Sequence, residues 1–111
     1  KPALAILGFG SDGHTASLFP GNQKIINNNG ENWLIVRNNW EDYARVSLSF
    51  DYLLRSEKII FLISGREKAS SLKESLNNNY NPIQFPVKYI FKNYNKSIHI
   101  LCDPAAGKYI T

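Results

Sequence analysis

The stretch ALAILGFGSDGHTASLFPG, residues 3–21, decides the fold of this chain. Its apolar beginning, Ala3–Leu7, predicts a short buried strand. Four glycines then surround Asp12 and His14. Glycine lets the backbone turn sharply and lets a ligand approach it closely. Because α/β proteins place their active sites in the loops that follow the strands, we expect the side chains of a functional site on this loop.

His14 is the candidate for proton transfer, since imidazole is the side chain that changes protonation near neutral pH. Asp12 stands two residues before it, within easy reach of a hydrogen bond. Taken singly, an Asp-Gly pair is more often a turn, and a Gly-x-Gly without the third glycine is a weak sign of a dinucleotide site. Ser17 lacks the Gly-x-Ser-x-Gly context of an activated serine, so we expect it to cap or pack.

Composition narrows the class of protein. The 111 residues suffice for one small domain with a modest core. The net charge of +4 fits an anionic small molecule, but the 13 lysines and arginines are scattered without a nucleic-acid-binding motif, so no nucleic acid partner is expected. No apolar stretch has the length of a membrane span, so no membrane partner is expected either.

The cysteine and histidine content predicts neither a disulfide nor a metal site. The single cysteine, Cys102, excludes an internal disulfide and fits a cytoplasmic protein, and we expect it to be a small buried residue of a strand. With only two histidines and no zinc-like spacing, we expect no metal and no cofactor. The second histidine, His99, alternates with apolar residues and is expected to be a packing residue.

The rest of the chain predicts strands interleaved with helices. The further strands are expected at Trp33–Val36, Arg45–Phe50, Lys58–Ile63 and Ser97–Cys102. A helix is expected at Arg66–Leu76, with short helical turns at Thr15–Phe19, at Asp51–Leu54 and after Asp103, and with a loop around Pro82 and Pro86. This order predicts an α/β fold, a Rossmann-like, mainly parallel sheet with flanking helices.

Two cations are candidates for binding phosphate. Lys68 lies one turn into a helix whose N-terminus follows a strand and a Ser-Gly turn, and such N-termini attract anions. Arg45 opens a strand and can hold a phosphate with two N–H groups. Composition alone favours solvated surface charges at both positions.

The string Gly8–Gly21 resembles, almost letter for letter, the motif of the 6-phosphogluconolactonases. Arg45–Ser49 and Phe61–Lys68 resemble that family's Arg-Val-Thr-Leu-Thr-like strand and Phe-Leu-Val-x-Gly-x-x-Lys-like strand and helix, in the same order. Ile100–Ala106 is similar to its closing strand. The resemblance spans about Ala3–Ala106 and covers the C-terminal half of a family member, so we expect residues 1–111 to be the C-terminal portion of a single, larger three-layer α/β domain.

The resemblance implies hydrolysis of 6-phosphoglucono-1,5-lactone to 6-phosphogluconate. It makes His14 the general base and Asp12 its companion, with Arg45 and Lys68 as contacts to the sugar phosphate. Backbone N–H groups of the glycine loop, with Gly10 and Gly13, are expected to bind the substrate and its developing oxyanion. A lactone carbonyl is already electrophilic, so this reaction needs no covalent nucleophile, metal or cofactor.

Two alternatives stay open. The related glucosamine-6-phosphate deaminase/isomerases share the Gly-x-x-Asp-Gly-His core, but they carry a glutamate before the proline where this chain has Phe19. The chain can also be a non-catalytic fragment, since the family's N-terminal half, with its phosphate loop, is absent from residues 1–111. An exposed sheet edge would then favour self-association.

Overall fold

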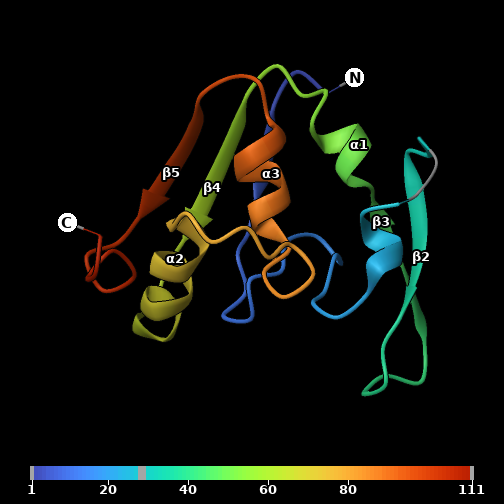
Figure 1. Cartoon of the computed structure of the whole chain (residues 1–111), viewed down its shortest axis with the longest axis horizontal. Coiled ribbons are helices and arrows are strands. Elements are labelled where there is room, and N and C mark those ends of the chain that lie inside the picture. Colours follow the sequence, from blue (N-terminus) through green and yellow to red (C-terminus); the bar gives the residue numbers. More distant parts are fainter. Residues whose placement is uncertain (1, 28–29, 111) are drawn as a thin grey trace.

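The computed structural model describes residues 2–27 and 30–110. Three parallel strands form its central sheet, in the order β1-β4-β5 (Figure 1). They are β1 (Ala5–Leu7), β4 (Ile59–Ile63) and β5 (Ile98–Cys102). β4 lies in the middle, with Ile59 opposite both Ala5 and Ile98. The expected α/β class with a parallel sheet is confirmed.

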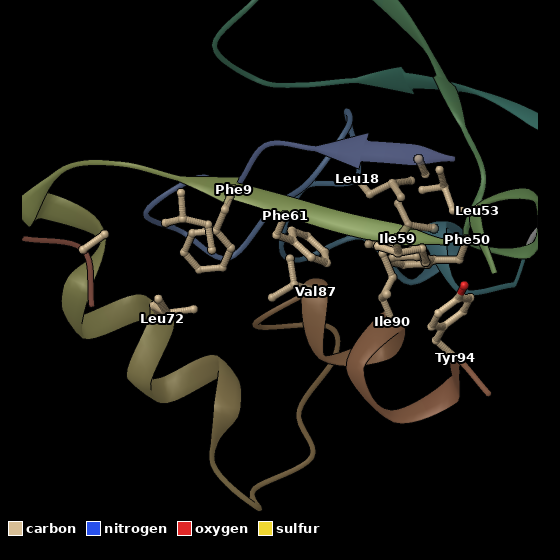
Figure 2. Packing of buried hydrophobic residues seen from close by; sticks show 14 residues of the cluster. Phe9, Leu18, Phe50, Leu53, Ile59, Phe61, Leu72, Val87, Ile90 and Tyr94 are labelled. Carbon is tan, nitrogen blue, oxygen red and sulfur yellow. The ribbon is translucent and has the colours of Figure 1, made fainter. Parts of the chain in front are cut away.

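Helices cover one face of this sheet. The α-helices are α1 (Phe50–Leu53), α2 (Ala69–Leu76) and α3 (Val87–Asn93), and the 3-10 turns are η1 (Gln23–Ile25) and η2 (Arg66–Lys68). Burial alternates along β4, whose first, third and fifth residues are buried. Figure 2 shows Ile59 and Phe61 of β4 pointing toward Val87 and Ile90 of α3. The core therefore lies between β4 and the helices.

The other two strands form a separate antiparallel hairpin, β2 (Trp33–Arg37) and β3 (Ala44–Leu48). Sequence patterning located both strands but did not separate them from the parallel sheet. The two strands pair antiparallel because the connection between them, residues 38–43, is too short for the crossover that parallel neighbours need. In Figure 1 this hairpin stands at the side of the molecule away from β5.

One helix escaped the sequence analysis, which assigned only a loop around Pro82 and Pro86. Pro86 occupies the N-cap position of α3 with helical backbone angles. Proline is well suited to a helix start, because its φ is already helical and its missing N–H has no partner to lose there. The proline therefore marks the beginning of a helix as well as the end of a loop.

Two predicted helical turns are wrong in detail. Residues Thr15–Phe19 form a tight turn in which the Leu18 N–H donates to the Thr15 carbonyl at 3.0 Å, with Ala16 at a φ of +51°. After Asp103 the chain makes successive turns without a helix, although the Asp103 carboxylate does accept the Ala106 N–H at 2.8 Å. The turn at Asp51–Leu54 is confirmed as α1, but its capping side chain is Ser49.

The second face of the parallel sheet is open to solvent in the described chain. Its exposed apolar side chains come from β1, β4, β5 and the residues before β1: Leu4, Ile6, Leu62 and Leu101. His99 lies on this face and is exposed, so the expectation that it packs in the core is wrong. The alternation along β5 correctly predicted a strand, but no described element covers the face of the sheet on which His99 lies. Cys102 is half-buried. None of the described helices has the length and apolar character to cross a membrane.

Candidate functional site

The carboxyl ends of β1, β4 and β5 meet at one edge of the sheet because the three strands are parallel. The glycine loop follows β1, the turn that begins η2 follows β4, and Asp103 follows β5. This edge is where α/β proteins bind their ligands. The topology therefore brings three sequence-distant segments to one place.

Backbone hydrogen bonds close the glycine loop on itself. The Gly10 N–H donates to the His14 carbonyl at 2.9 Å, and the Gly13 N–H donates to the Gly10 carbonyl at 2.9 Å. The Thr15 hydroxyl, which is buried, donates to the Gly8 carbonyl at 2.7 Å. The N–H groups of Gly10 and Gly13 are thus engaged inside the loop. Their direct contact with a substrate stays a prediction, and the role visible here is to shape the loop.

Neighbouring helices hold the loop in place. The Ser71 hydroxyl of α2 donates to the Ser11 carbonyl. The Val87 N–H at the start of α3 donates to the Gly13 carbonyl at 3.0 Å. A side chain at Gly13, whose φ is +85°, would collide with Phe85 at 2.8 Å. Loop, α2 and α3 therefore form one packed unit.

Asp12 and His14 form the central pair of the site. Asp12 Oδ1 lies 2.5 Å from His14 Nδ1 and also accepts the His14 backbone N–H at 3.1 Å. Both side chains reach solvent, with 30% of His14 and 48% of Asp12 exposed. A carboxylate only accepts hydrogen bonds, so it favours the imidazole tautomer with its proton on Nδ1 and leaves Nε2 as the proton acceptor.

Gly10 makes this geometry possible. A Cβ atom at residue 10 would lie 2.2 Å from both Nδ1 and Cε1 of His14 and 2.9 Å from Asp12 Oδ1. The imidazole therefore rests directly against the bare Cα of Gly10. The sequence analysis predicted that Gly10 lets a ligand approach the backbone closely. In the structure, the group that lies against Gly10 is the histidine of the same loop.

A cavity of about 690 Å³ opens beside the pair. Its lining comes from the glycine loop and from the turn after β4: Gly8, Phe9, Gly10, Ser11, Asp12, His14, Thr15, Ala16, Glu67 and Lys68. The volume suits a small-molecule ligand. Of the predicted site residues, Asp12, His14, Gly10 and Lys68 thus come together, while Gly13 and Arg45 do not line this cavity. Glu67 lines it and was not predicted.

Asp103 fastens the turn that carries Glu67 and Lys68. Its carboxylate accepts the Ser64 hydroxyl at 2.8 Å and the Gly65 N–H at 3.2 Å. The hydrogen bond from the Ala106 N–H, with those from Ser64 and Gly65, lowers the Asp103 pKa, and the positive charge of Lys68 acts in the same direction. Asp103 therefore links the ends of β4 and β5 and fixes one wall of the cavity.

Arg45 of β3 is held by a carboxylate that the sequence analysis did not assign. Its Nε donates to both oxygens of Glu41, at 2.9 and 3.0 Å, and its Nη2 also binds Glu41. Tyr43 and Asn38 each add a hydrogen bond at 2.9 Å. The hydrogen bond from Arg45 has the largest effect on Glu41, and together these bonds lower the pKa of Glu41 from 4.5 to about 2. The same pairing with Glu41 raises the pKa of Arg45. A four-residue spacing of opposite charges is a pairing signal only on a helix, so it did not reveal this pair in a hairpin.

Phe19 links this ion pair to the histidine. The Arg45 guanidinium lies 5.7 Å from the centre of the Phe19 ring, on which Trp40 packs edge-on at 5.5 Å. Phe19 also packs against the His14 ring, at 4.6 Å between centroids. Arg45 thus reaches the site through an aromatic ring. Among the described residues, no group of three metal-ligating side chains is arranged to hold an ion.

We predict that Gly10→Ala displaces the His14 ring, because the new methyl group would occupy the place of the imidazole. The ring C–H signals of His14 in a two-dimensional NMR spectrum should shift, while those of the exposed His99 stay in place as an internal control. Unchanged His14 signals in a folded variant would show that the ring does not rest on residue 10.

The Glu41–Arg45 pair should persist in acid. A folded-state pKa of about 2, against an ordinary 4.5, means that the folded protein keeps this carboxylate charged where the unfolded chain takes up a proton. Its stabilisation is therefore present above pH 4.5 and is lost as the pH falls toward 2. NMR titration of the Glu41 carboxyl carbon should show this low midpoint, and Arg45→Gln should raise it. A midpoint near 4.5 in the unmodified protein would contradict the pairing.

Comparison with known proteins identifies the family of this chain. The family profile described as glucosamine-6-phosphate isomerases/6-phosphogluconolactonase matches residues 1–100. A 6-phosphogluconolactonase of Helicobacter pylori strain J99 is 41% identical over 90 residues, which cover 81% of this chain and 39% of that protein.

Solved structures show the same fold. The 6-phosphogluconolactonase of Trypanosoma brucei superimposes with a TM-score of 0.79 at 25% identity, over 98% of this chain and 42% of that one. A monomeric glucosamine-6-phosphate deaminase superimposes with a TM-score of 0.77 at 21% identity, over 96% of this chain and 47% of that one. The chain thus spans less than half the length of these relatives, and it belongs to the glucosamine-6-phosphate isomerase/6-phosphogluconolactonase family.

Proposed function

We propose that the protein to which this chain belongs hydrolyses 6-phosphoglucono-1,5-lactone to 6-phosphogluconate. One observation carries the proposal: the Asp12–His14 pair, 2.5 Å apart, lines the same cavity as Lys68. The proposed base and a positively charged side chain therefore border the same space, whose volume suits a sugar phosphate. The similarity to 6-phosphogluconolactonases supports the lactone as the substrate.

The reaction needs a base for water and an acid for the leaving oxygen. His14 Nε2 accepts a proton from a water molecule as the water oxygen bonds to the lactone carbonyl carbon. The ring C–O bond then breaks, and the imidazolium returns the proton to the ring oxygen, which becomes a hydroxyl group. Acid–base assistance of this kind is worth on the order of 100- to 10,000-fold in rate. Asp12 holds the Nδ1 proton and stabilises the imidazolium between the two transfers.

Lys68 is the proposed partner of the substrate phosphate within the described chain. It stands in the 3-10 turn that precedes α2, and it lines the cavity opposite the glycine loop. Arg45 is a second proposed contact, but Glu41 holds it by two nitrogens and it lies outside the lining. A phosphate therefore meets an Arg45 whose Nε and Nη2 already donate to Glu41, and it would bind through Nη1 or replace the Glu41 carboxylate.

The related deaminase chemistry is less well supported. The deaminase/isomerases carry a glutamate where this chain has Phe19. The Phe19 side chain is 9% exposed and packs its ring against His14. An apolar ring here cannot take up or release a proton. We therefore expect no ammonia from glucosamine 6-phosphate, and release at a rate comparable to lactone hydrolysis would reverse the choice.

We predict that His14→Ala lowers kcat for the lactone at least about a hundredfold with little change in KM, because the base acts mainly in the transition state. Lys68→Gln should instead raise KM, since it removes a charge that binds the ground state as well. Lys58→Gln, an exposed lysine before β4 at the far end of the sheet, is the matched control. Near-normal kcat in a folded His14→Ala protein would remove His14 from the mechanism.

We also propose that this chain is the C-terminal portion of a larger α/β domain whose remainder covers the second face of the sheet. Parallel sheets are normally covered on both faces, and here Leu62 and Leu101 are exposed. In isolation, this face and the unpaired edge of β5 should favour self-association.

Sedimentation of residues 1–111 alone should then show mass increasing with concentration, and Leu101→Lys should weaken the association. The Lys58→Gln variant should behave as the unmodified chain. A strictly monomeric chain at every concentration would contradict self-association through this surface.

A further inference from the structure

A second cavity, of about 470 Å³, lies between the C-terminal end of α2 and helix α3. Its lining consists of the end of α2, the asparagine-rich loop that follows and one side of α3: Ser75, Leu76, Asn77, Asn78, Asn79, Tyr80, Lys88, Phe91 and Lys92. It shares no residue with the cavity of the Asp12–His14 pair. Nothing in the proposed reaction uses it. We call it the α2–α3 cleft.

Lys88 is the unusual group in this cleft. It is only 3% exposed, yet its ammonium is held by neutral oxygens, the side-chain carbonyl of Asn77 at 2.7 Å and the backbone carbonyl of Asn79. Within residues 2–27 and 30–110, no carboxylate forms an ion pair with it. Buried charges are normally paired with an opposite charge, and an ammonium has three donors. Lys88 therefore has capacity for an anion.

Lys92 adds a second positive charge at the same wall. It follows Lys88 by one helical turn on α3, and this spacing places both side chains on one side of the helix. Its ammonium lies 4.2 Å from the centre of the Tyr80 ring, where it packs on the aromatic face. No acidic residue lines the cleft. The nearest carboxylate given by the hydrogen bonds, that of Glu74, lies outside the lining and accepts the Asn77 amide N–H at 2.9 Å. Two lysines in the lining itself favour a ligand with more than one negative charge.

The remaining lining favours a ligand that is also flat and apolar. Tyr80 and Phe91 offer aromatic surface beside the two lysines, and Tyr80 is 42% exposed. The Ser75 hydroxyl at the same wall is buried and has no hydrogen-bond partner within the described chain. Aromatic rings of ligands pack well on such side chains.

We propose that the α2–α3 cleft binds a phosphate joined to an aromatic ring, that is, a ligand of the nucleotide class. The phosphate pairs with the Lys88 and Lys92 ammonium groups, and the ring packs against Tyr80 and Phe91. Its volume is sufficient for a mononucleotide. Because the cleft is separate from the proposed catalytic cavity, this binding does not depend on the proposed reaction.

The experiment is an NMR titration of the full chain with adenosine 5′-monophosphate, adenosine and inorganic phosphate in parallel. The nucleotide should shift amide signals of residues 75–80 and 88–92 and bind more tightly than either of its parts. Lys92→Gln should weaken nucleotide binding about tenfold, the usual effect of losing one charge-assisted hydrogen bond. Lys58→Gln, which changes an exposed lysine outside the cleft, should bind like the unmodified protein.

A purely structural role for Lys88, as a fastener of the asparagine loop, predicts a different result. The nucleotide would then leave the signals of the cleft unchanged, or shift only those of the glycine loop and Lys68. Either outcome overturns the proposal, as does unaltered affinity in Lys92→Gln. Because Lys92 is exposed, that variant is expected to fold even where Lys88→Gln does not.

Discussion

The contact between the His14 imidazole and the bare Cα of Gly10 is the constraint on which the site depends. It leaves no room for a side chain at residue 10, and it places Nδ1 where the Asp12 carboxylate can hold it. The same turn brings the Gly10 N–H to the His14 carbonyl. Backbone closure and side-chain orientation are therefore one feature, and a change to either alters the other.

The parallel sheet brings the other groups of the site to this loop. Strands that run the same way end at the same edge, so the loop after β1 faces the turn after β4, and Asp103 after β5 fixes that turn. Lys68 reaches the cavity for this reason, although it lies far from His14 in sequence. The Ser71 hydroxyl on Ser11 and the Val87 N–H on Gly13 then hold the loop to two helices.

Sequence patterns predicted what depends on local chemistry. Apolar and alternating runs located β1, β4 and β5, and the Asp12–His14 spacing anticipated the pair, because both depend on neighbours within a few residues. Contacts between distant residues were not predictable in this way. Arg45 was expected at a phosphate, yet Glu41 holds it, and Phe19 rather than a polar group connects it to His14. Likewise, the exposure of His99 depends on which elements cover β5, and no pattern within β5 reveals that.

The central claim is that Asp12 orients His14 so that Nε2 faces the cavity as the proton acceptor. The nitrogen NMR spectrum of the His14 ring, recorded where the ring is neutral, tests it most directly because it distinguishes the two tautomers. The account predicts a proton on Nδ1 and none on Nε2, with the preference lost in Asp12→Asn. A neutral ring protonated on Nε2 would contradict it, because that nitrogen then has no lone pair to accept a proton from water.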